Sequence, residues 1–586
     1  MIKRLFSYAG EYKKYVFLAP LFVILETAGE LALPLLIAKI IDDGILMGNL
    51  PMIYRIGIYM VIMAIAAVFL GAYGAKFGSY GSIGIGANLR QAEFRNISRF
   101  SFADIDYFSS ASLVTRLTND VTNVQNFVMM MIRMLWRTLA QIIVSLVVLF
   151  TMQWQLALIL VASIPVIGVA IAILMTKCHP LFELMQKKID ELNEKVQENL
   201  VGIRVVKAFV REDYEEEKFQ QANDAFTHAG LKAVLTIVLQ QPIMMMGITI
   251  VTGLVLYFGG QMVLGGTLAV GTLSSIVTYI FNILISIMMI AMVLLQYVRA
   301  SACAERIFEV IDKEPSIEDG EDAVDELPAP AGQVEFRHVN FKYKAGGSGD
   351  DVLHDINFVA RPGQTVAIVG GTGVGKSSLV NLIPRFYDVT GGEVLLDGVD
   401  VRKYPVEALR KRIGMVLQNN VLFSGTIREN LLWGDPNATE EQVIQAAKDA
   451  QAYDFIMSFP DGFDTHLEQG GVNVSGGQKQ RLCIARAMLR KPAVLILDDS
   501  TSAVDTATDA KIRHSFAEKI PGTTVFIIAQ RISSVENADK VLVLDNGRVS
   551  GFDTPENLLK TNAIYQDVYN SQTKGSGDFD EKGGEA

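Results

Sequence analysis

The sequence predicts a membrane all-α six-helix transmembrane domain followed by an α/β P-loop NTPase domain. Apolar residues make up 50% of the 586 residues, and they concentrate in the first half of the chain, in runs long enough to cross a bilayer. From Val334 onwards, short β-like runs alternate with helical patterns, which is typical of α/β domains. The stretch Gly370–Ser377 matches G-x-x-x-x-G-K-[ST], the loop that holds nucleotide phosphates.

Composition argues against several other classes of protein. A formal net charge of −11 disfavours a general nucleic-acid binder, whose surface would be basic. The three cysteines, Cys178, Cys303 and Cys483, lie far apart and show no C-x-x-C spacing. Neither a disulfide framework nor a zinc site is therefore expected. The first long apolar run has no small-residue cleavage site, which argues against a cleaved signal peptide.

Six apolar runs are long enough to span a bilayer. They lie at about 15–41, 53–75, 135–153, 155–176, 236–261 and 270–298. The segments ~85–133 and ~177–232 carry many Lys and Arg residues, whereas the predicted loop Asp42–Pro51 has two aspartates and neither Lys nor Arg. The positive-inside rule therefore places both termini and the basic segments in the cytoplasm. The membrane expected for this multi-pass protein is the plasma (cell inner) membrane.

The two basic segments are predicted to be extensions of the membrane helices. In the second of them, Val196, Leu200, Ile203, Val206 and Val210 recur at helical spacing, which favours helices that continue past the bilayer and turn around in the cytosol. An independent soluble subdomain between the spans is the alternative.

Glu26 and Glu30 interrupt the first apolar run. Because they stand four residues apart, they share one face of the predicted helix. Carboxylates inside a membrane are costly and usually face a cavity or a partner. Two interpretations stay open: contact with a cationic part of a substrate, or a structural hydrogen bond to a neighbouring helix.

Changes in composition predict the domain boundaries. The transmembrane domain is expected at 1–312. The segment 313–332 is acidic, contains three prolines and lacks apolar periodicity, so it is predicted to be a linker. The nucleotide-binding domain is expected at 333–573, and the polar tail 574–586 is predicted to be disordered.

The phosphate loop lies between a predicted strand, Thr365–Val369, and a predicted helix. Its glycines let backbone amides converge on the phosphates, and the helix N-terminus adds partial positive charge. Lys376 is expected to reach the β- and γ-phosphates of ATP, and Ser377 to bind Mg²⁺. The predicted nucleotide contacts here are Gly370, Gly371, Thr372, Gly373, Val374, Gly375, Lys376, Ser377 and Ser378.

Two motifs follow the phosphate loop. Val494–Asp498 is an apolar strand ending in a carboxylate, and an aspartate in this position holds Mg²⁺ directly or through water. A second helix is predicted to open with Ser475, Gly476, Gly477 and Gln478. Ser475 is a plausible N-cap, and the glycines let the helix N-terminus approach an anion. Since one ATP needs one phosphate loop, a second phosphate-binding helix start indicates a second chain at the nucleotide.

With these motifs in this order, the chain resembles the ATP-binding cassette (ABC) exporters over nearly its whole length, as a half-transporter with one ABC-type nucleotide-binding domain. The resemblance implies that Tyr343 stacks on adenine and that Gln418 touches Mg²⁺ and senses the membrane domain. It implies that the loop ending in Asp505, Ser502–Asp505, crosses to the opposite nucleotide site. Phe102–Ser110 and Val205–Tyr214 would be the cytoplasmic turns that dock on the nucleotide-binding domains. In this family, each of two ATP sites combines one chain's phosphate loop with the other chain's S-G-G-Q.

Three positions depart from the family pattern. Asp499 stands where the family usually has the glutamate that polarises attacking water, and Gln530 stands where it usually has histidine. Aspartate is one methylene shorter, and a misplacement near 1 Å can cost on the order of 100-fold in rate. Gln530 can hydrogen-bond the γ-phosphate but cannot carry a proton. Leu467–Gly470 differs from the usual glutamate-bearing pattern. The candidate catalytic residues are therefore Asp499, Gln530 and Gln418, at a site expected to hydrolyse ATP slowly.

The intact stretch Ser475–Gln478 would serve the ATP of a partner, so the sequence favours a heterodimer over a homodimer with two slow sites. The expected function is outward transport of an amphipathic substrate (drug, lipid or peptide) by alternating access, with ATP and Mg²⁺ bound. An ATP-gated channel or regulatory membrane protein is the alternative from another class. The six spans disfavour a soluble cassette motor, and the fusion of membrane and ATP domains in one chain disfavours an importer.

Overall fold

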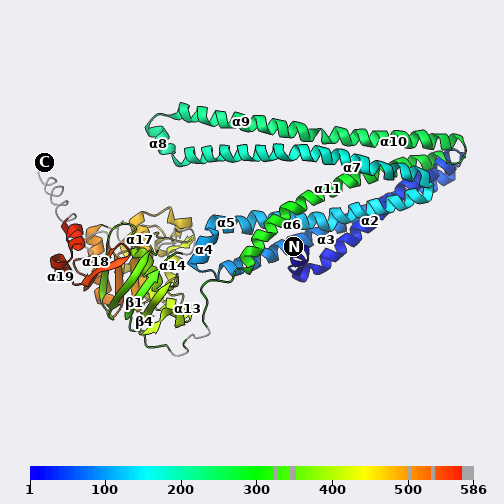
Figure 1. Ribbon diagram of the computed structural model, residues 1–586. Helices are drawn as coiled ribbons and strands as arrows, with labels where there is room; N and C mark the ends of the chain where they lie inside the picture. The colour runs from blue at the N-terminus through cyan, green and yellow to red at the C-terminus, as the bar shows by residue number, and fades with distance from the viewer. Residues whose placement is uncertain (321–323, 325–326, 344–350, 499–504, 530–534, 571–586) are drawn as a thin grey trace. The chain divides into compact units, whose positions relative to one another are not determined.

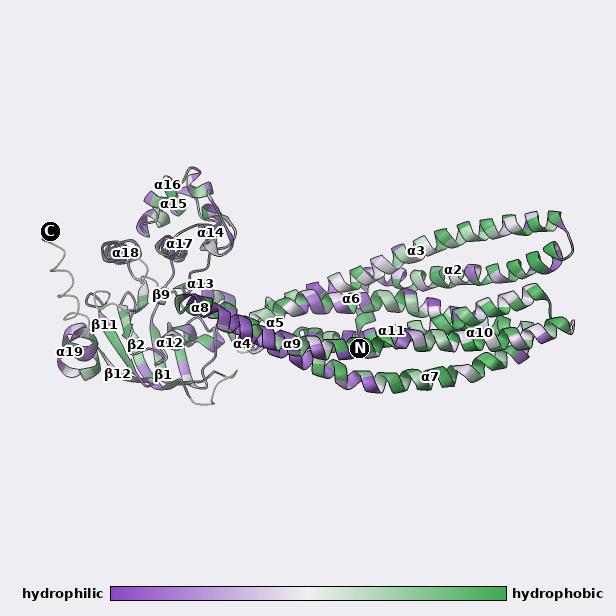
Figure 2. Ribbon diagram, turned by 90° about the horizontal axis from the view of Figure 1, so that it is seen from above, coloured by the Kyte–Doolittle hydropathy of each residue, from purple (hydrophilic) through white to green (hydrophobic). Residues whose placement is uncertain are grey.

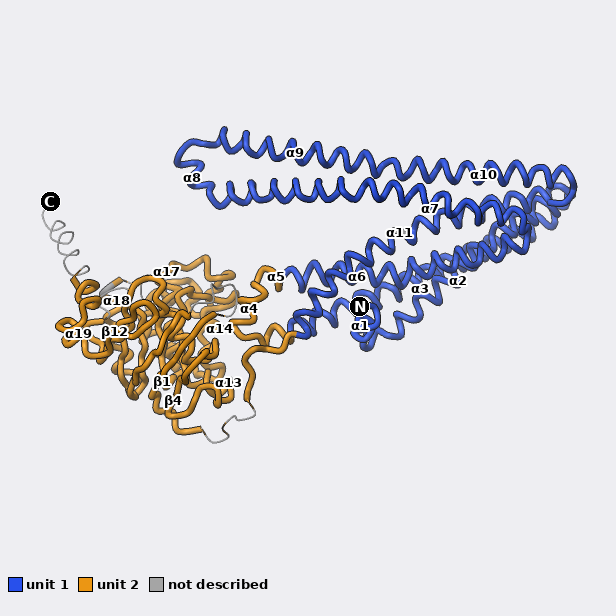
Figure 3. The backbone as a smooth tube through the Cα atoms, in the orientation of Figure 1, with its two compact units in different colours: residues 1–94, 114–312 blue, residues 95–113, 313–586 orange. Residues whose placement is uncertain are grey.

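The computed structural model describes residues 1–320, 324, 327–343, 351–498, 505–529 and 535–570. The chain forms two compact units, which Figure 3 draws in different colours. The first unit comprises Met1–Phe94 and Val114–Asp312, and the second comprises Arg95–Leu113 and Lys313–Ala586. A short segment between two stretches of the first unit, Arg95–Leu113, thus belongs to the second unit.

The first unit consists of helices (Figure 1). They are α1 (Ile2–Ser7), η1 (Gly10–Tyr12), α2 (Lys13–Lys39), η2 (Ile40–Ile45), α3 (Leu50–Ile97), α5 (Ser110–Thr115), η3 (Arg116–Asp120), α6 (Val121–Met130), η4 (Met131–Leu135), α7 (Trp136–Val201), α8 (Ile203–Ala208), α9 (Glu212–Val238), α10 (Gln240–Leu264) and α11 (Val270–Asp312). The last turn of α3 and the start of α5 lie in the segment that belongs to the second unit.

Five helical stretches in the described part of the chain are long and apolar enough to cross a membrane. They are Gly10–Ile45, Leu50–Ile97, Ser110–Val201, Glu212–Leu264 and Val270–Asp312. The third is broken at Gln153, whose backbone is extended (φ −158°, ψ 93°). This residue lies where the sequence predicts a turn between the runs 135–153 and 155–176, and after it α7 runs beside α9 (Figure 1). The six predicted apolar runs therefore lie on five helical stretches, one of which is broken.

Several helices are longer than a bilayer requires. α3 has 48 residues and α11 has 43, whereas about 20 residues span the hydrocarbon core. The parts of α7 and α9 next to α8 are hydrophilic, and the remaining parts of the long helices are mostly hydrophobic (Figure 2). Through ~177–232 the chain is helical, in α7, α8 and α9, and this stretch belongs to the first unit.

Two sheets build most of the second unit. The larger sheet has the order β12-β11-β3-β10-β9-β6, and its neighbours are parallel except for β12, which pairs antiparallel with β11. The smaller sheet, β2-β1-β4-β5, is antiparallel. The strands, with the short pair β7 and β8, are β1 (Val334–Phe341), β2 (Leu353–Ala360), β3 (Thr365–Val369), β4 (Gly391–Leu396), β5 (Val399–Asp400), β6 (Ile413–Val416), β7 (Gly425–Thr426), β8 (His466–Leu467), β9 (Val494–Asp498), β10 (Thr524–Ile528), β11 (Lys540–Asp545) and β12 (Arg548–Asp553).

α12 and α17 pack on opposite faces of the larger sheet. The helices of this unit are α4 (Phe102–Phe108), α12 (Lys376–Leu382), α13 (Val406–Lys411), α14 (Ile427–Leu432), α15 (Glu440–Asp449), α16 (Tyr453–Ser458), α17 (Gly476–Leu489), α18 (Thr506–Lys519) and α19 (Pro555–Thr561), with the turns η5 (Val401–Lys403), η6 (Gly462–Asp464) and η7 (Gln469–Gly471). Successive strand residues point to opposite faces. Val494 and Ile496 accordingly share an apolar cluster with α12, whereas Leu495 and Leu497 share another with α17.

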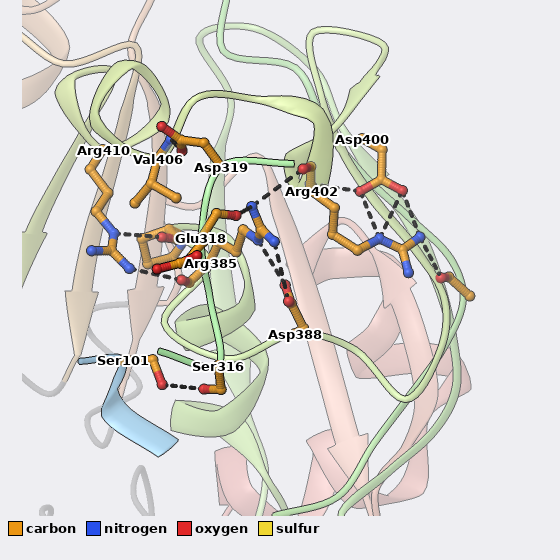
Figure 4. A network of polar contacts seen from close by, with 12 residues as sticks. Ser101, Ser316, Glu318, Asp319, Arg385, Asp388, Asp400, Arg402, Val406 and Arg410 are labelled. Atoms are coloured by element: carbon orange, nitrogen blue, oxygen red, sulfur yellow. Dashed lines mark hydrogen bonds and ion pairs between the residues drawn. The ribbon is translucent and has the colours of Figure 1, made fainter. Parts of the chain in front are cut away.

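The start of the predicted linker 313–332 is hydrogen-bonded to its own unit (Figure 4). The backbone N–H of Ser316 donates to the Asp104 carboxylate at 2.9 Å. The backbone N–H of Val406 donates to Asp319 at 2.7 Å, and the buried Arg385 guanidinium donates to the carbonyl of Glu318 at 3.4 Å. These contacts fix the first part of the linker against α4 on one side and the sheet domain on the other.

Candidate nucleotide-binding site

The phosphate loop joins the carboxyl end of β3 to α12. Gly370 adopts φ +156°, and a Cβ atom added there would lie 2.3 Å from the carbonyl oxygen of Leu544. Gly375, directly before α12, is left-handed (φ +97°), a conformation that favours glycine. Among the described residues, no side chain makes a capping hydrogen bond at Gly375, the N-cap of α12. A glycine-rich loop that leads into a helix N-terminus suits the binding of an anion by backbone N–H groups.

Lys376 folds back over the loop that precedes it. Its Nζ donates to the carbonyl oxygens of Gly370 at 2.9 Å and Gly371 at 2.6 Å. Gly371, Thr372 and Gly373 are exposed, so the loop is open to solvent beside the ammonium group. The arrangement places one positive charge above a set of backbone donors, which suits the phosphates of a nucleotide.

Ser377 and Asp498 meet across the end of the sheet. The Ser377 hydroxyl donates to Asp498 Oδ1 at 3.1 Å, and the Asp498 carboxylate is buried at the last residue of β9. A hydroxyl and a carboxylate are the hard oxygen ligands that Mg²⁺ prefers. This pair of oxygen donors therefore fits the Mg²⁺ that the sequence predicts here, with Gln418 as the third expected contact.

The strand register places the carboxyl ends of β3, β6, β9 and β10 at the same edge of the larger sheet. Asp498 pairs with Ile528, the last residue of β10, and Ile528 pairs with Ile368 of β3. Gln418 is exposed and lies two residues beyond β6, whose Val416 pairs with Leu497. The predicted catalytic residues Asp499 and Gln530, and Ser502–Val504 of the predicted crossing loop, lie outside the described residues.

Tyr343 lies beside the phosphate-loop helix. Its hydroxyl shares a hydrogen bond of 2.9 Å with the hydroxyl of Ser378, in the first turn of α12. Its half-buried ring packs edge-on against Phe341 and Tyr387, with centroids 4.8 and 5.1 Å away. An aromatic ring at this position, next to the loop, is suited to stacking on a nucleotide base.

The S-G-G-Q stretch forms the start of α17, as expected. Ser475 and Gln478 form a reciprocal capping box: Ser475 Oγ accepts from the Gln478 N–H, and Gln478 Oε1 accepts from the Ser475 N–H at 2.9 Å. Gly476 is exposed and Gly477 is half-buried. α17 and α12 pack in different clusters on opposite faces of the larger sheet, so this helix start and the phosphate loop belong to different cores of the domain.

Asp505 and Leu467–Gly470 are also placed by local contacts. The Asp505 side chain accepts from the N–H of Thr508 at the start of α18, and this hydrogen bond lowers the pKa of the exposed Asp505 carboxyl. The N–H of Gly470 donates to the carbonyl of Leu422 at 3.1 Å. The segment that differs from the family pattern is thus bonded to the loop that follows Gln418.

The two predicted docking turns have different surroundings. α4, within Phe102–Ser110, contacts the sheet domain of its own unit: Phe102 stacks on Phe386 with centroids 4.4 Å apart, and the Tyr387 hydroxyl donates to Asp106 at 2.7 Å. Val205–Tyr214 covers the end of α8 and the start of α9, and its apolar Phe209 side chain is 74% exposed. Tyr387 belongs to no sequence motif and was not predicted, whereas Asp106 lies within the predicted turn Phe102–Ser110.

Glu26 and Glu30 share one partner, Arg137 of α7. Arg137 donates to Glu26 Oε1 at 3.2 Å and to Glu30 Oε2 at 2.7 Å. A Cβ atom at Gly71 of α3 would lie 2.7 Å from the Glu26 carboxylate, so this glycine makes room for it. A lone arginine in the predicted run 135–153 was the available signal for Arg137. These contacts fit the structural interpretation of the two glutamates.

The chain is similar to known proteins over nearly its whole length. Residues 16–288 match the ABC transporter transmembrane region, and residues 353–502 match the ABC transporter family. The uncharacterized ABC transporter ATP-binding protein YfiB of Bacillus subtilis is 36% identical over 97% of this chain and 98% of its own. An ATP-dependent lipid A-core flippase of Syntrophus aciditrophicus is 32% identical over 98% of this chain and 95% of its own. The solved structure of a bacterial Atm1-family ABC exporter with ATP bound is similar with a TM-score of 0.78 and 25% identity, covering 96% of this chain and 98% of that one.

Proposed function

The chain belongs to the ABC transporter family, and from this premise we propose that it is the slow-site subunit of a heterodimeric exporter. It is an ABC exporter, embedded in a membrane by several spans, that binds ATP and couples ATP hydrolysis to transport. The observation that carries the proposal is the position of the two anion-binding helix starts. The phosphate loop leads into α12, which packs on one face of the sheet. Ser475 caps α17, which packs in the other apolar cluster on the opposite face.

In the proposed complex, each nucleotide lies between two chains. Lys376 binds the phosphates of the ATP on this chain's own loop, and Ser377 and Asp498 hold its Mg²⁺. The metal neutralises phosphate charge. Ser475–Gln478 presents the N-terminal amides of α17 to the ATP on the partner's loop. Tyr343 stacks on the adenine of the first ATP.

The sequence supports unequal rates at the two sites. Asp499 retains the negative charge of the usual glutamate but reaches one methylene less far, and Gln530 offers a hydrogen bond without a titratable proton. The ATP on this chain's loop is therefore held for long periods, and the partner-based site performs the faster hydrolysis that resets the transporter.

The exposed apolar tip around α8 supports a second chain. Val205, Phe209 and Val210 are strongly exposed, and large exposed apolar patches mark interaction surfaces. The distribution of Lys and Arg supports a plasma-membrane orientation with both termini in the cytoplasm. The substrate class we propose is amphipathic, a drug, lipid or peptide, moved outward by alternating access.

The first test uses this chain alone in lipid nanodiscs. We expect slow ATP turnover, abolished ATP binding in Lys376→Ala, and a rise of about 10-fold or more in Asp499→Glu/Gln530→His, because the double variant restores both reach and the titratable ring. Fast turnover by the lone chain that Asp499→Asn abolishes would contradict the slow site and favour a homodimer.

The second test addresses the partner and the transport. An affinity-tagged chain purified from its native membrane should carry one equivalent of a different half-transporter in which the aspartate equivalent to Asp498 is followed by glutamate. In inverted vesicles, the complex should accumulate an amphipathic dye in the presence of ATP. ATP-dependent ion current without accumulation would instead favour the ATP-gated channel.

A further inference from the structure

A continuous chain of side-chain contacts joins the phosphate-loop helix to α4. The Ser378 hydroxyl bonds the Tyr343 hydroxyl at 2.9 Å. The Tyr343 ring packs edge-on against Tyr387, with centroids 5.1 Å apart and planes at 87°. The Tyr387 hydroxyl then donates to Asp106 of α4 at 2.7 Å. All four residues belong to the second unit.

The Tyr387–Asp106 bond is a strong link. Its acceptor is a carboxylate, and hydrogen bonds to ionised groups are shorter and roughly twice as strong as neutral ones. Burial of the phenol, and then the neighbouring Asp106 charge, raise the pKa of Tyr387. The hydroxyl therefore keeps its proton, and the bond is donated from tyrosine to aspartate throughout the physiological range.

α4 has attachments other than the Tyr387–Asp106 bond. The Phe102 ring packs against Phe386, with centroids 4.4 Å apart, and lies 6.3 Å from the Tyr387 ring. Ser101 caps the helix through Asp104, and the Ser101 hydroxyl bonds Ser316 of the linker at 2.6 Å (Figure 4). Lys313 also lies 3.7 Å from Asp104. These contacts tie the N-terminal turn of α4 to the linker, so they hold α4 in place whatever the base site contains.

A cleft of about 240 Å³ lies between α4, the start of the linker and Tyr387, lined by Asp104, Tyr107, Lys313, Ser316 and Tyr387 among others. Interiors that are fully packed resist small displacements, whereas a cleft leaves room for Tyr387 and α4 to shift together. A change in the tilt of the Tyr343 ring reaches Tyr387 directly through their edge-on contact.

We propose that Tyr387 is a positioning residue that couples the presence of a base on Tyr343 to the seating of α4, through its hydrogen bond to Asp106. The inference rests on the proposed role of Tyr343 in base binding. Stacking of the base fixes the Tyr343 ring, the ring fixes Tyr387, and Tyr387 holds α4 through Asp106. Phosphates bound without a base do not fix the Tyr343 ring and therefore do not change how Tyr387 holds α4.

The test measures hydrogen exchange of the α4 backbone amides in the full chain in nanodiscs. ATP should slow exchange in Phe102–Phe108 by about 5-fold or more, the lower end of typical coupling between sites. Inorganic tripolyphosphate, which offers phosphates without a base, should leave α4 unprotected while it protects the phosphate loop. Equal protection of α4 by tripolyphosphate and ATP would overturn the proposal.

Variants then locate the coupling. Tyr387→Phe and Asp106→Ala should each remove most of the ATP effect on α4, and the double variant should be no worse than either, because both break the same bond. Asp106→Asn keeps an acceptor oxygen and should restore part of the effect. ATP affinity and the thermal midpoint of Tyr387→Phe should stay within about 2-fold and a few degrees of the parent.

Tyr453→Phe is the matched control, since it removes a tyrosine hydroxyl in the same unit from the other apolar cluster. It should leave the ATP effect on α4 unchanged. Wild-type coupling in Tyr387→Phe, or additive losses in the double variant, would overturn the proposal. Because this readout needs only ATP binding, it stays informative if the heterodimer or the direction of transport is wrong. If ATP protects α4 in Tyr343→Ala as strongly as in the parent chain, the proposed base-binding role of Tyr343 is contradicted.

Discussion

Arg137 of α7 donates to the Glu30 carboxylate of α2 at 2.7 Å, and the same guanidinium also binds Glu26. One cation therefore faces two carboxylates near the midpoint of α2, a helix rich in apolar residues. Arg137 is 41% exposed and Glu30 is 38% exposed. Charged side chains avoid lipid and face cavities or partners inside membranes, so this side of α2 and α7 is expected to face polar surroundings.

We expect Arg137→Gln to destabilise the chain more than Glu30→Gln. Loss of the arginine leaves two carboxylates without their cation, whereas loss of one glutamate charge leaves a neutral pair. Removing one partner of a buried pair costs about 3–5 kcal/mol, and less is expected here because Arg137 is partly exposed. Thermal unfolding in nanodiscs checks the order of the two midpoints. An equal loss in both variants would contradict the charge-balance explanation.

The second prediction concerns pH and Glu93, in the part of α3 beyond the predicted span 53–75. Glu93 is fully buried, and its carboxyl oxygens lack a hydrogen-bond partner among the described residues. Burial, and then the nearby Asp120 charge, raise the pKa of Glu93 to about 8, with Arg116 and Arg90 opposing the shift. Asp120 itself is paired with Arg306 at 2.7 Å.

A carboxyl group with a raised pKa binds its proton more tightly in the folded chain than in the unfolded chain. The folded state is therefore penalised as pH rises from about 4.5, the ordinary value, to about 8. Glu93→Gln stays neutral and avoids this penalty. We expect the variant to match the parent at pH 5 and to unfold at a higher temperature at pH 8.5, in thermal scans across that range. A parallel pH dependence of the two proteins would contradict the assignment.

The third prediction concerns the Mg²⁺ ligands. Because the Ser377 hydroxyl lies 3.1 Å from Asp498, it is placed to share the metal with that carboxylate. EDTA should weaken ATP binding to the parent chain, measured with a fluorescent ATP analogue, and should have little further effect on Ser377→Ala. Ser378→Ala is the adjacent control, because Ser378 bonds Tyr343 instead. It should keep the full response to EDTA.

Local patterns predicted parallel strands better than antiparallel strands. β3 has the predicted bounds, Thr365–Val369, because every residue of this strand is apolar or small. β2, β4 and β12 were not predicted. They alternate buried and exposed residues or hold glycines, so their sequences lack a continuous apolar run.

The residues of the candidate site also fall into two groups: those that a local pattern predicts and those that it does not. The phosphate loop, Asp498 and Ser475 belong to short linear motifs, and the sequence places them. The Tyr387–Asp106 bond joins residues 281 positions apart, and Arg137 meets Glu26 across 111 positions. Such pairs have no local signature, because only the packing of distant segments brings them together.

The last prediction distinguishes two roles of Ser475: capping of α17, and binding of the ATP on the partner chain. Ser475→Ala removes a capping-box hydroxyl, which costs about 1 kcal/mol of stability. It also alters the helix start that would face the partner's phosphates. Removing one donor of such an electrostatic site lowers turnover by about 100-fold or more, so we expect a loss of that order in the assembled complex. ATP binding to the lone chain should stay unchanged, since α12 packs in another core.

Thr439→Ala provides the matched control, because Thr439 forms an equivalent capping box with Gln442 at the start of α15. It should cause a similar loss of stability, read as the thermal midpoint, while the complex keeps its ATP turnover. Equal losses of turnover in the two variants would reduce the role of Ser475 to helix capping. Weaker ATP binding by the lone chain carrying Ser475→Ala would mean that the S-G-G-Q stretch serves this chain's own phosphate loop.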